Sequence, residues 1–368
     1  MLYFDNAATT QISKSSLDSY IKASEQFFNP SALYAQAGKS KQLLEQARTY
    51  FLNKFHAPNK STFIFTGSAT EANNSVLHAH ITRKEKKYIF SAGEHSSIYE
   101  TAKDYKENGY NVVFIPLNKD GTINQDKLFE EIDNTTALVS IIHVSNETGA
   151  VNDIKSICKR IKGINSNIVV HSDGVQALGK LDINLSDLGV DYYTMSAHKI
   201  NGPKGVAVLY INKPNRFKPF VIGGGQEMSL RSGTENLPGI LAFQTAVEGL
   251  THTDFTEHKK AILQQIKQDH VLVSSDNCVD NIISICFKGV RGETILHMLE
   301  AQGYLIGTGS ACNSKAGLNR VLQPIVDKAY IEGAVRISFG NDVSVEDCTN
   351  LGKALDCAVA EYILRIRR

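Results

Sequence analysis

Seven short apolar runs, most of them followed by a stretch with helical amphipathic spacing, constrain the fold of this chain most strongly. They are STFIFT, KKYIFS, NVVFIPL, TALVSIIHVS, NIVVHSD, VDYYTMS and GVAVLYI, between residues 61 and 211. Such runs, alternating with helical patterns, are typical of a parallel sheet wrapped by helices. The sequence therefore predicts an α/β fold, with a large domain over residues 20–250 built on a mainly parallel sheet.

A smaller unit is expected after the large domain, because 368 residues are too many for one ordinary core. The charged stretch THTDFTEHKKAILQQIKQDH, residues 251–270, predicts a helix that links the two units. Beyond it, NIISICF, YLIGTGS and VRISFG predict a few strands before a terminal helix. We expect residues 251–368, together with the N-terminal segment 1–19, to form a small α+β domain.

The charge balance bears on the partners of the chain. Its 39 Lys and Arg residues nearly cancel its 38 Asp and Glu residues, so no overall field attracts nucleic acid or an anionic membrane. No window approaches about 18 continuous apolar residues, and MLYFDNAATTQ has no basic segment before an apolar stretch. The sequence predicts a cytoplasmic protein that binds no membrane and no nucleic acid directly.

The six cysteines lie outside any Cys-x-x-Cys pair, and their spacing matches neither a zinc site nor a disulfide scaffold, so no bound metal is expected. Apolar patterns predict that four of them pack in the interior: Cys158, Cys286, Cys348 and Cys357. The residues around Cys278 predict neither burial nor a functional role. Cys312 differs, because GTGSACNSKAG surrounds it with glycine and polar residues, which predicts a loop. A thiol exposed in a loop is a liability, so its presence there indicates a functional role.

Polar residues stand just after the predicted strands, where open α/β sheets bind their ligands. After the first run, TGSATEANN leads into a helix whose first-turn amides, at Ala69 and Thr70, can bind a phosphate. The other polar residues at strand ends are His95, Asn146, Asp173, Gln176, Ser196, His198 and Lys199. Each has an ordinary explanation as a cap, a turn former or a solvated side chain, but together they favour one shared site.

This set matches the needs of a site for pyridoxal 5'-phosphate (PLP). Such a site uses a lysine amine for a Schiff base, a carboxylate that keeps the ring nitrogen protonated, and an anchor for the phosphate. Lys199 would carry the cofactor, and Asp173 would pair with the ring nitrogen. The other contacts follow by position, with the ring face assigned to His95, the phenolic oxygen to Gln176, and the phosphate to Thr70, Ser196 and His198.

Longer motifs run through almost the whole chain: YFDNAATT, NPSALYAQAG, FTGSATEANN, EHSS, HVSNETG, SDGVQ, SAHKINGPKGV, GGGQEMSLRSGTEN, GSACNS and VRISFG. In these the sequence resembles the class V aminotransferase family of PLP enzymes and, within it, the cysteine desulfurases of the NifS and IscS type. Two positions depart from the usual family pattern, with Tyr34 in place of a histidine and Gly174-Val175 in place of two alanines. Both changes spare the chemical groups, so they bear on substrate placement more than on the reaction.

The resemblance implies further roles. It matches Arg336 in VRISFG to an arginine that binds the substrate carboxylate, with Asn146 beside it. Thr234 in RSGTEN matches a residue that reaches the phosphate of the neighbouring subunit's cofactor, which implies a homodimer. Cys312 in GSACNS matches the sulfur-accepting cysteine.

The implied activity is conversion of L-cysteine to L-alanine, with Lys199, His95 and Cys312 as catalytic residues and a persulfide left on Cys312 for a sulfur-acceptor protein. The acceptor would serve tRNA thiolation, iron–sulfur assembly or a thiamin pathway, and the short end YILRIRR favours a thiolation enzyme. Two alternatives stay open. One is another class V enzyme, an aminotransferase, racemase or β-lyase, in which Cys312 is incidental, and the other is a sulfur-delivery platform active mainly with a partner.

Overall fold

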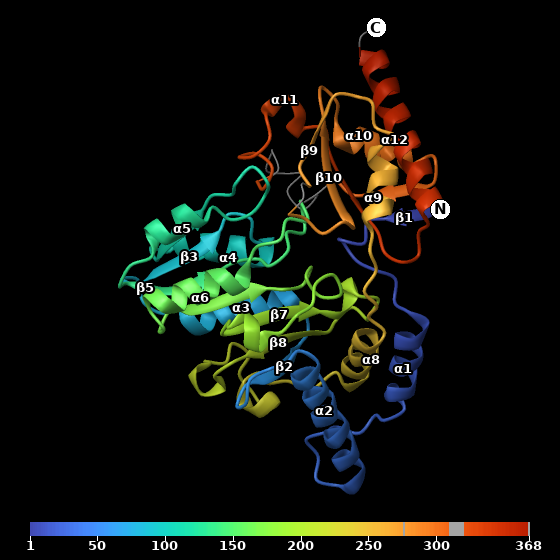
Figure 1. Ribbon diagram of the computed structural model, residues 1–368. Helices are drawn as coiled ribbons and strands as arrows, with labels where there is room; N and C mark the ends of the chain where they lie inside the picture. The colour runs from blue at the N-terminus through green and yellow to red at the C-terminus, as the bar shows by residue number, and fades with distance from the viewer. Residues whose placement is uncertain (275–276, 309–319, 367–368) are drawn as a thin grey trace.

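The central element of the chain is a seven-stranded sheet with the order β2-β8-β7-β6-β5-β3-β4, seen in a computed structural model that describes residues 1–274, 277–308 and 320–366 (Figure 1). Its strands are β2 (Thr62–Thr66), β3 (Lys87–Ser91), β4 (Asn111–Ile115), β5 (Thr136–Ser140), β6 (Val169–Asp173), β7 (Tyr192–Ser196) and β8 (Ala207–Ile211). Neighbours are parallel except where β8 runs antiparallel to β2 and β7. The predicted mainly parallel sheet is confirmed, and each apolar run contributes one strand.

Helices cover both faces of this sheet. Successive strand residues point to opposite sides, so the apolar side chains of one strand pack against helices on both faces. Phe63 and Phe65 belong to the largest core cluster, which includes side chains of α2, α6 and α8, whereas Ile64 between them packs with residues of α3. Tyr88 and Phe90 of β3 pack with α3 and α4. The covering helices are α2 (Ala35–Lys54), α3 (Ala69–His80), α4 (Ser96–Glu107), α5 (Gln125–Glu131), α6 (Ile154–Ile164) and α8 (Leu237–Glu248), with a short α7 (Leu185–Leu188).

A second core lies in the upper part of Figure 1, around the antiparallel sheet β12-β10-β9 and the parallel pair β1-β11. Its strands are β1 (Leu2–Phe4), β9 (His270–Leu272), β10 (Ile282–Phe287), β11 (Tyr304–Ile306) and β12 (Ala334–Ser338). Its helices are α9 (Thr256–Leu263), α10 (Gly292–Glu300), α11 (Lys328–Ile331) and α12 (Val345–Ile366). Strand β1 joins this core, whereas α1 (Lys14–Ser24) packs on α8. The division of the chain at residue 250 stays a prediction.

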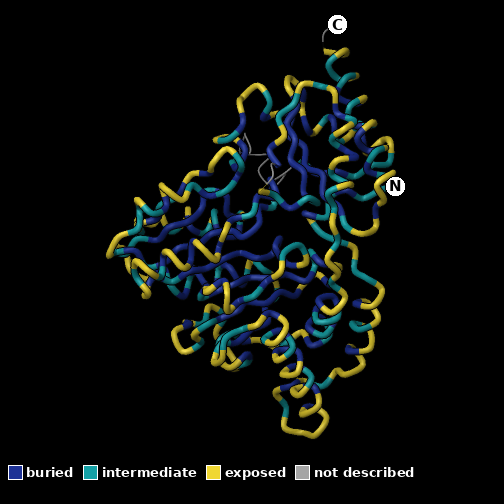
Figure 2. The backbone as a smooth tube through the Cα atoms, viewed as in Figure 1, coloured by how far each residue is buried: buried dark blue, intermediate teal, exposed yellow. Residues whose placement is uncertain are grey.

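Every residue of β2, β7, β8 and β10 is buried, and dark blue segments run through the middle of both parts of the molecule in Figure 2. Cys158, Cys286 and Cys348 lie in these cores, as predicted. Cys357 is exposed, so its predicted burial is wrong. It lies on α12 but off the stripe formed by Cys348, Leu351 and residues 355 and 358.

The helix predicted over residues 251–270 is shorter, since α9 covers only Thr256–Leu263. The reason is a tertiary contact. The amides of Lys267 and Gln268 donate to Asp356 Oδ1 of α12 at 2.7 Å and 3.0 Å, which turns the chain toward β9. The helical spacing of residues 251–270 could not reveal this contact, because its partner Asp356 lies far away in the sequence.

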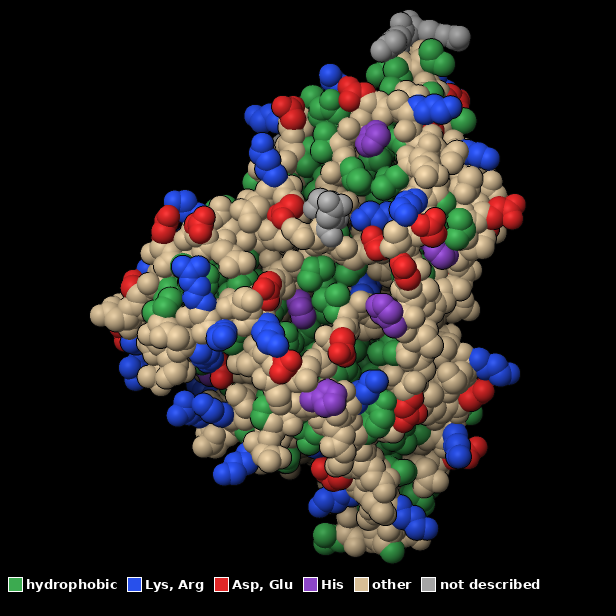
Figure 3. Space-filling view, in the orientation of Figure 1, with side chains coloured by type: hydrophobic (Ala, Val, Ile, Leu, Met, Phe, Trp, Pro, Cys, Tyr) green, Lys and Arg blue, Asp and Glu red, His purple; other side chains and the backbone are tan. Residues whose placement is uncertain are grey.

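The surface shows no segregation of charge on the face drawn in Figure 3, where Lys and Arg side chains are interspersed with Asp and Glu. Within residues 1–274, 277–308 and 320–366, no helix is both long and apolar enough to cross a membrane. The same residues contain no group of three or more His, Cys, Asp or Glu side chains arranged to hold a metal ion.

Candidate active site

Asp173 is the last residue of β6, at the carboxyl end of the sheet. It is 3% exposed, and its Oδ2 accepts a hydrogen bond of 2.9 Å from Asn73 Nδ2 on α3. The Val175 amide donates to Oδ1 at 3.0 Å. These neutral donors hold a buried carboxylate in place, which suits a partner for a protonated ring nitrogen. Sequence reasoning missed Asn73, although the motif FTGSATEANN contains it.

Lys199 follows β7 at the end of a short 3₁₀ turn, Ala197–Lys199. Its Nζ donates to the carbonyl oxygens of Ala7 and Ala8 at 2.5 Å and 2.6 Å. Burial and, to a smaller extent, the charge of Arg336 lower the pKa of the Lys199 amine to about 8, although Asp5 and Asp173 oppose the shift. An appreciable fraction of this amine is therefore neutral near pH 7.5, as a nucleophilic or proton-transferring lysine requires.

His95 is the N-cap residue of α4, where its Nδ1 accepts from the Ser97 amide at 3.2 Å and lies 2.9 Å from Ser97 Oγ. The side chain is accessible, yet the protein around it restricts its hydration and so lowers the pKa of His95. Asp173 opposes that shift and Lys199 adds to it. The ring of His95 thus lies within electrostatic reach of both Asp173 and Lys199.

Gln176 is 3% exposed, and both ends of its amide have partners. Its Nε2 donates to the Ala7 carbonyl at 2.9 Å, and its Oε1 accepts from Lys180 Nζ at 3.1 Å. Burial lowers the pKa of Lys180 to about 7, with the charge of Lys199 adding to the effect. A donor at one end and an acceptor at the other fix the orientation of the Gln176 amide. Lys180 was not predicted.

The first turn of α3 offers free amides, as predicted. Ser68 is the N-cap, and its side chain accepts from the Glu71 amide at 3.1 Å. Ala69 and Thr70 occupy the first two helical positions, where backbone amides have no intrahelical acceptor. This end of the helix suits an anion such as a phosphate.

Ser196 and His198 flank the lysine turn. Ser196 ends β7 and is 2% exposed. His198 Nδ1 lies 3.1 Å from Thr9 Oγ1, and burial lowers the pKa of His198 to about 4, with Lys199 and Lys204 adding to the effect. His198 is therefore neutral at pH 7 and can serve as a hydrogen-bonding partner.

Arg336 lies on β12 in the second core and is 6% exposed. Its NH1 donates to the Asn146 carbonyl at 2.8 Å, and its NH2 forms an ion pair of 2.9 Å with Asp5 Oδ1. The Asn146 side chain donates to Glu147 Oε1 at 3.0 Å. The structure thus brings Arg336 and Asn146 together, as predicted, and adds Asp5, which the sequence analysis did not single out.

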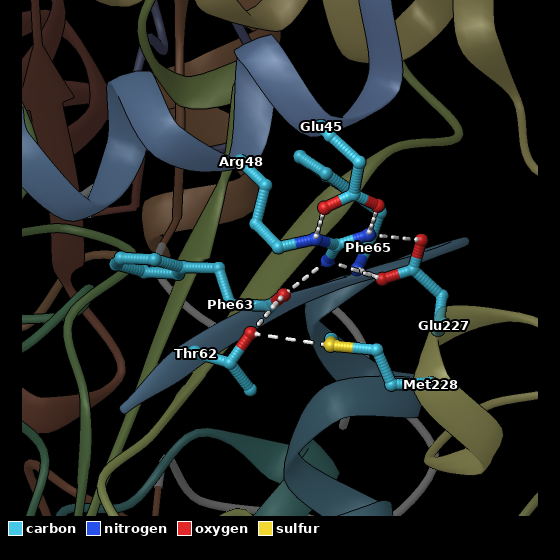
Figure 4. Close-up of polar contacts among 7 residues, drawn as sticks. All are labelled: Glu45, Arg48, Thr62, Phe63, Phe65, Glu227 and Met228. Atoms are coloured by element: carbon cyan, nitrogen blue, oxygen red, sulfur yellow. Dashed lines mark hydrogen bonds and ion pairs between the residues drawn. The ribbon is translucent and has the colours of Figure 1, made fainter. Parts of the chain in front are cut away.

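Glu227 belongs to a turn with unusual backbone geometry. The residues Glu227–Ser229 have φ values of 48°, 58° and 64°, a left-handed conformation that is uncommon without glycine. Glu227 Oε2 lies 2.8 Å from Arg48 NH1 and accepts from the Phe65 amide at 2.9 Å, with both charged side chains almost fully buried (Figure 4). The pair with α2 holds the turn in this conformation.

Thr234 follows that turn and is exposed. Between the two, Arg231 forms a second ion pair with Glu71 at the start of α3, with Nε 2.6 Å from Oε1. The segment with Thr234 is therefore fixed to the start of α3, the helix whose first-turn amides have no intrahelical acceptor. The predicted contact of Thr234 with a neighbouring subunit stays a prediction.

Gly174 departs from the usual family pattern, and the structure gives the reason. A Cβ atom at this position would lie 2.0 Å from Tyr193 Cε1, so no side chain fits. Tyr193 is fully buried, and its hydroxyl lies 2.6 Å from His143 Nδ1. The tyrosine ring thus occupies the space that an alanine methyl group would need.

Cys312 lies outside the described residues, and its role stays a prediction. The chain is described again from Arg320, whose guanidinium donates to the carbonyl oxygens of Ala92 and Glu94. It also stacks 3.7 Å from the centre of the Tyr99 ring. Arg320, eight residues after Cys312, is thus tied to the turn that precedes His95.

These residues fit PLP on their chemistry. The site has a buried carboxylate held by neutral donors, a lysine amine with a lowered pKa, and two helix-start amides for a phosphate. Asn73 Oδ1 is moreover buried without a hydrogen-bond partner among the described residues. No side chain of the set has the wrong charge or chemistry for its assigned contact.

Comparisons with known proteins point to one family. Residues 2–351 match the aminotransferase class-V family. A relative from Archaeoglobus fulgidus, named cysteine desulfurase IscS 1, is 32% identical over 329 residues, which cover 86% of this chain and 85% of the relative. A solved structure titled NifS-like protein is 29% identical, with a TM-score of 0.88 and coverage of 98% of this chain and 99% of its own. Another, titled SspA in complex with cysteine, is 29% identical with a TM-score of 0.81 and covers 92% and 99%.

The family match spans nearly the whole chain, and members of this family use PLP. The relative and the NifS-like structure confirm the resemblance to the cysteine desulfurases of the NifS and IscS type. The chain therefore belongs to the class V aminotransferase family.

Proposed function

We propose that this chain is a PLP-dependent cysteine desulfurase, which converts L-cysteine to L-alanine and transfers the sulfur to Cys312. The observation that carries the proposal is the meeting of three charged groups from different elements. Arg336 of β12 and Asp173 of β6 both act on the pKa of Lys199 after β7. The names of the relatives support cysteine as the substrate.

The residues at the strand ends would hold PLP. Asp173 would face the ring nitrogen, Gln176 Nε2 the phenolic oxygen and His95 the ring. The phosphate would lie at the amides of Ala69 and Thr70, with Ser196, His198 and a second subunit's Thr234 as further donors. When bound, PLP supplies an electron sink that stabilises negative charge at the substrate α-carbon.

Lys199 moves the proton in this proposal. Its amine, with a pKa of about 8, is basic enough to take the proton from the substrate α-carbon and is neutral often enough to do so. Arg336 binds the substrate carboxylate with its planar guanidinium, and Asn146 lies beside it. This grip orients the α-carbon toward Lys199.

Cys312 accepts the sulfur. Its thiolate attacks the substrate sulfur, an S–S bond forms, and the C–S bond of the substrate breaks with its electron pair left on the β-carbon. That carbon then takes up a proton. Cysteine and a thiol give alanine and a persulfide, which balances in atoms and electrons without an external oxidant.

The proposal includes a homodimer, because Thr234 is assigned to a neighbouring subunit, and a sulfur-acceptor protein of tRNA thiolation or iron–sulfur assembly. A cytoplasmic location stays a prediction.

The test is alanine formation from L-cysteine by the PLP-loaded protein. Lys199→Ala should lower the rate by about 1,000-fold or more, because the variant lacks the group that moves the proton. Lys155→Ala is the matched control, since Lys155 is exposed on α6 and pairs with Asp187. Alanine formation at the wild-type rate in Lys199→Ala would contradict the proposal.

A further inference from the structure

The N-terminal segment Asp5–Thr10 joins the two parts of the site. At one end, the Ala7 amide donates to Ser338 Oγ of β12 at 2.8 Å. At the other end, the Thr10 amide donates to the His198 carbonyl at 2.8 Å, next to the lysine. The segment therefore bridges the strand that carries the arginine and the turn that carries the lysine.

Asp5 begins this bridge and holds the arginine. Two nitrogens of the Arg336 guanidinium are in use, NH1 on the Asn146 carbonyl at 2.8 Å and NH2 on Asp5 Oδ1 at 2.9 Å. The third, Nε, is buried without a hydrogen-bond partner among the described residues. The plane of the guanidinium is thus fixed from two sides. Because a guanidinium has five N–H donors, NH1 and NH2 each keep a second N–H for another acceptor.

Gly307 encloses the ion pair. A Cβ atom at residue 307 would lie 2.7 Å from Asp5 Oδ1 and 3.2 Å from Arg336 NH2. The backbone of Gly307 also exchanges two hydrogen bonds with that of Arg336, at 2.9 Å and 2.7 Å. Main chain on this side leaves the Asp5 carboxylate little room to swing away from the guanidinium.

We propose that Asp5 is a positioning residue, which orients the Arg336 guanidinium for the substrate and thereby sets selectivity for an α-carboxylate. The inference rests on the proposed function, in which Arg336 binds that carboxylate. A two-point grip on a carboxylate requires a guanidinium in a defined plane. Without Asp5, a buried charge would lose its counter-ion, and the side chain would turn toward other partners.

The test compares L-alanine with L-alaninamide, which differ only in the carboxylate. Binding of each to the PLP-loaded protein is measured by titration, followed by the absorption of the cofactor. We expect the wild type to prefer L-alanine, and Asp5→Asn to reduce that preference by about tenfold or more, with little change for the amide. Asp18→Asn, the same charge change at an exposed position of α1, should match the wild type.

A second variant covers the case in which Asp5→Asn folds poorly. Gly307→Ala keeps Asp5 but presses a methyl group on its Oδ1, so it should reduce the same preference. If both variants keep the wild-type preference for L-alanine, or if Asp5→Asn binds L-alanine more tightly, the positioning role of Asp5 is refuted. The proposed function is not affected by either result. A wild type without any preference for L-alanine overturns this inference together with the substrate grip of the proposed function.

Discussion

Replacement of Gly174 by alanine tests the packing next to Asp173. The added Cβ would lie 2.0 Å from Tyr193 Cε1, 2.1 Å from Cζ and 2.3 Å from the hydroxyl oxygen. The backbone cannot retreat easily, because the Gly174 amide donates to the Thr194 carbonyl at 2.9 Å. The ring must therefore shift, which disturbs the hydrogen bond between its hydroxyl and His143.

The magnitude follows from these contacts. Overpacking of a core costs about 1–3 kcal/mol, and loss of the Tyr193–His143 hydrogen bond adds about 1 kcal/mol. We expect Gly174→Ala to lower the free energy of unfolding by about 2–4 kcal/mol. Tyr193→Leu alone should also destabilise the protein, because it leaves space and an unpaired His143. In the double variant, the alanine methyl group no longer meets the ring.

Urea unfolding of the four proteins at 25 °C gives the coupling between the two positions. The double variant should be more stable than the sum of the single changes by about 1–3 kcal/mol. Gly163→Ala is the control, since nothing lies within 4 Å of its Cβ on α6, and it should stabilise the protein by about 0.5–1 kcal/mol. Additive effects at positions 174 and 193 would refute the steric reasoning.

Three further predictions concern ionisable groups. Because burial lowers the pKa of Lys199 to about 8, the rate at which apo-protein captures PLP should rise with pH through a midpoint near 8, and a midpoint near 10.5 by stopped-flow absorption would contradict this. Burial also lowers the pKa of His80 to about 4 in the folded protein. Between pH 6.5 and 4, His80 therefore binds a proton in the unfolded chain but stays mainly neutral in the folded one. The free energy of unfolding should therefore fall between pH 6.5 and 4, and His80→Gln should flatten that slope. Glu227→Gln removes the buried counter-ion of Arg48 and leaves it only the half-exposed Glu45, so it should cost about 3–5 kcal/mol in urea unfolding, whereas Glu130→Gln in an exposed pair should leave stability nearly unchanged.

The sheet could be predicted from the sequence because each strand is a compact apolar run between polar turns. The meeting of Asp173 and Lys199 in the candidate site could be predicted from the sheet, since parallel strands end at one edge. Arg336 came only from the resemblance, because no periodic pattern links β12 to that edge.

What could not be predicted depends on contacts between distant residues. Asp5 and Arg336 are 331 positions apart, and the motif YFDNAATT does not indicate which residue its aspartate contacts. The fit of Tyr193 under Gly174 is equally invisible, because it depends on the exact separation of a ring and a backbone atom. Such contacts become visible only when the packing is known.

The most direct test of the proposed desulfurase is the fate of the substrate sulfur. The PLP-loaded protein is exposed briefly to L-cysteine without reductant, digested and analysed by mass spectrometry. We predict one added sulfur on the peptide that contains Cys312, none on the peptides of the other five cysteines, and loss of alanine formation in a Cys312→Ser variant that still binds PLP. Undiminished alanine formation by Cys312→Ser, or added sulfur on a different peptide, would contradict the assignment of Cys312 as the sulfur acceptor.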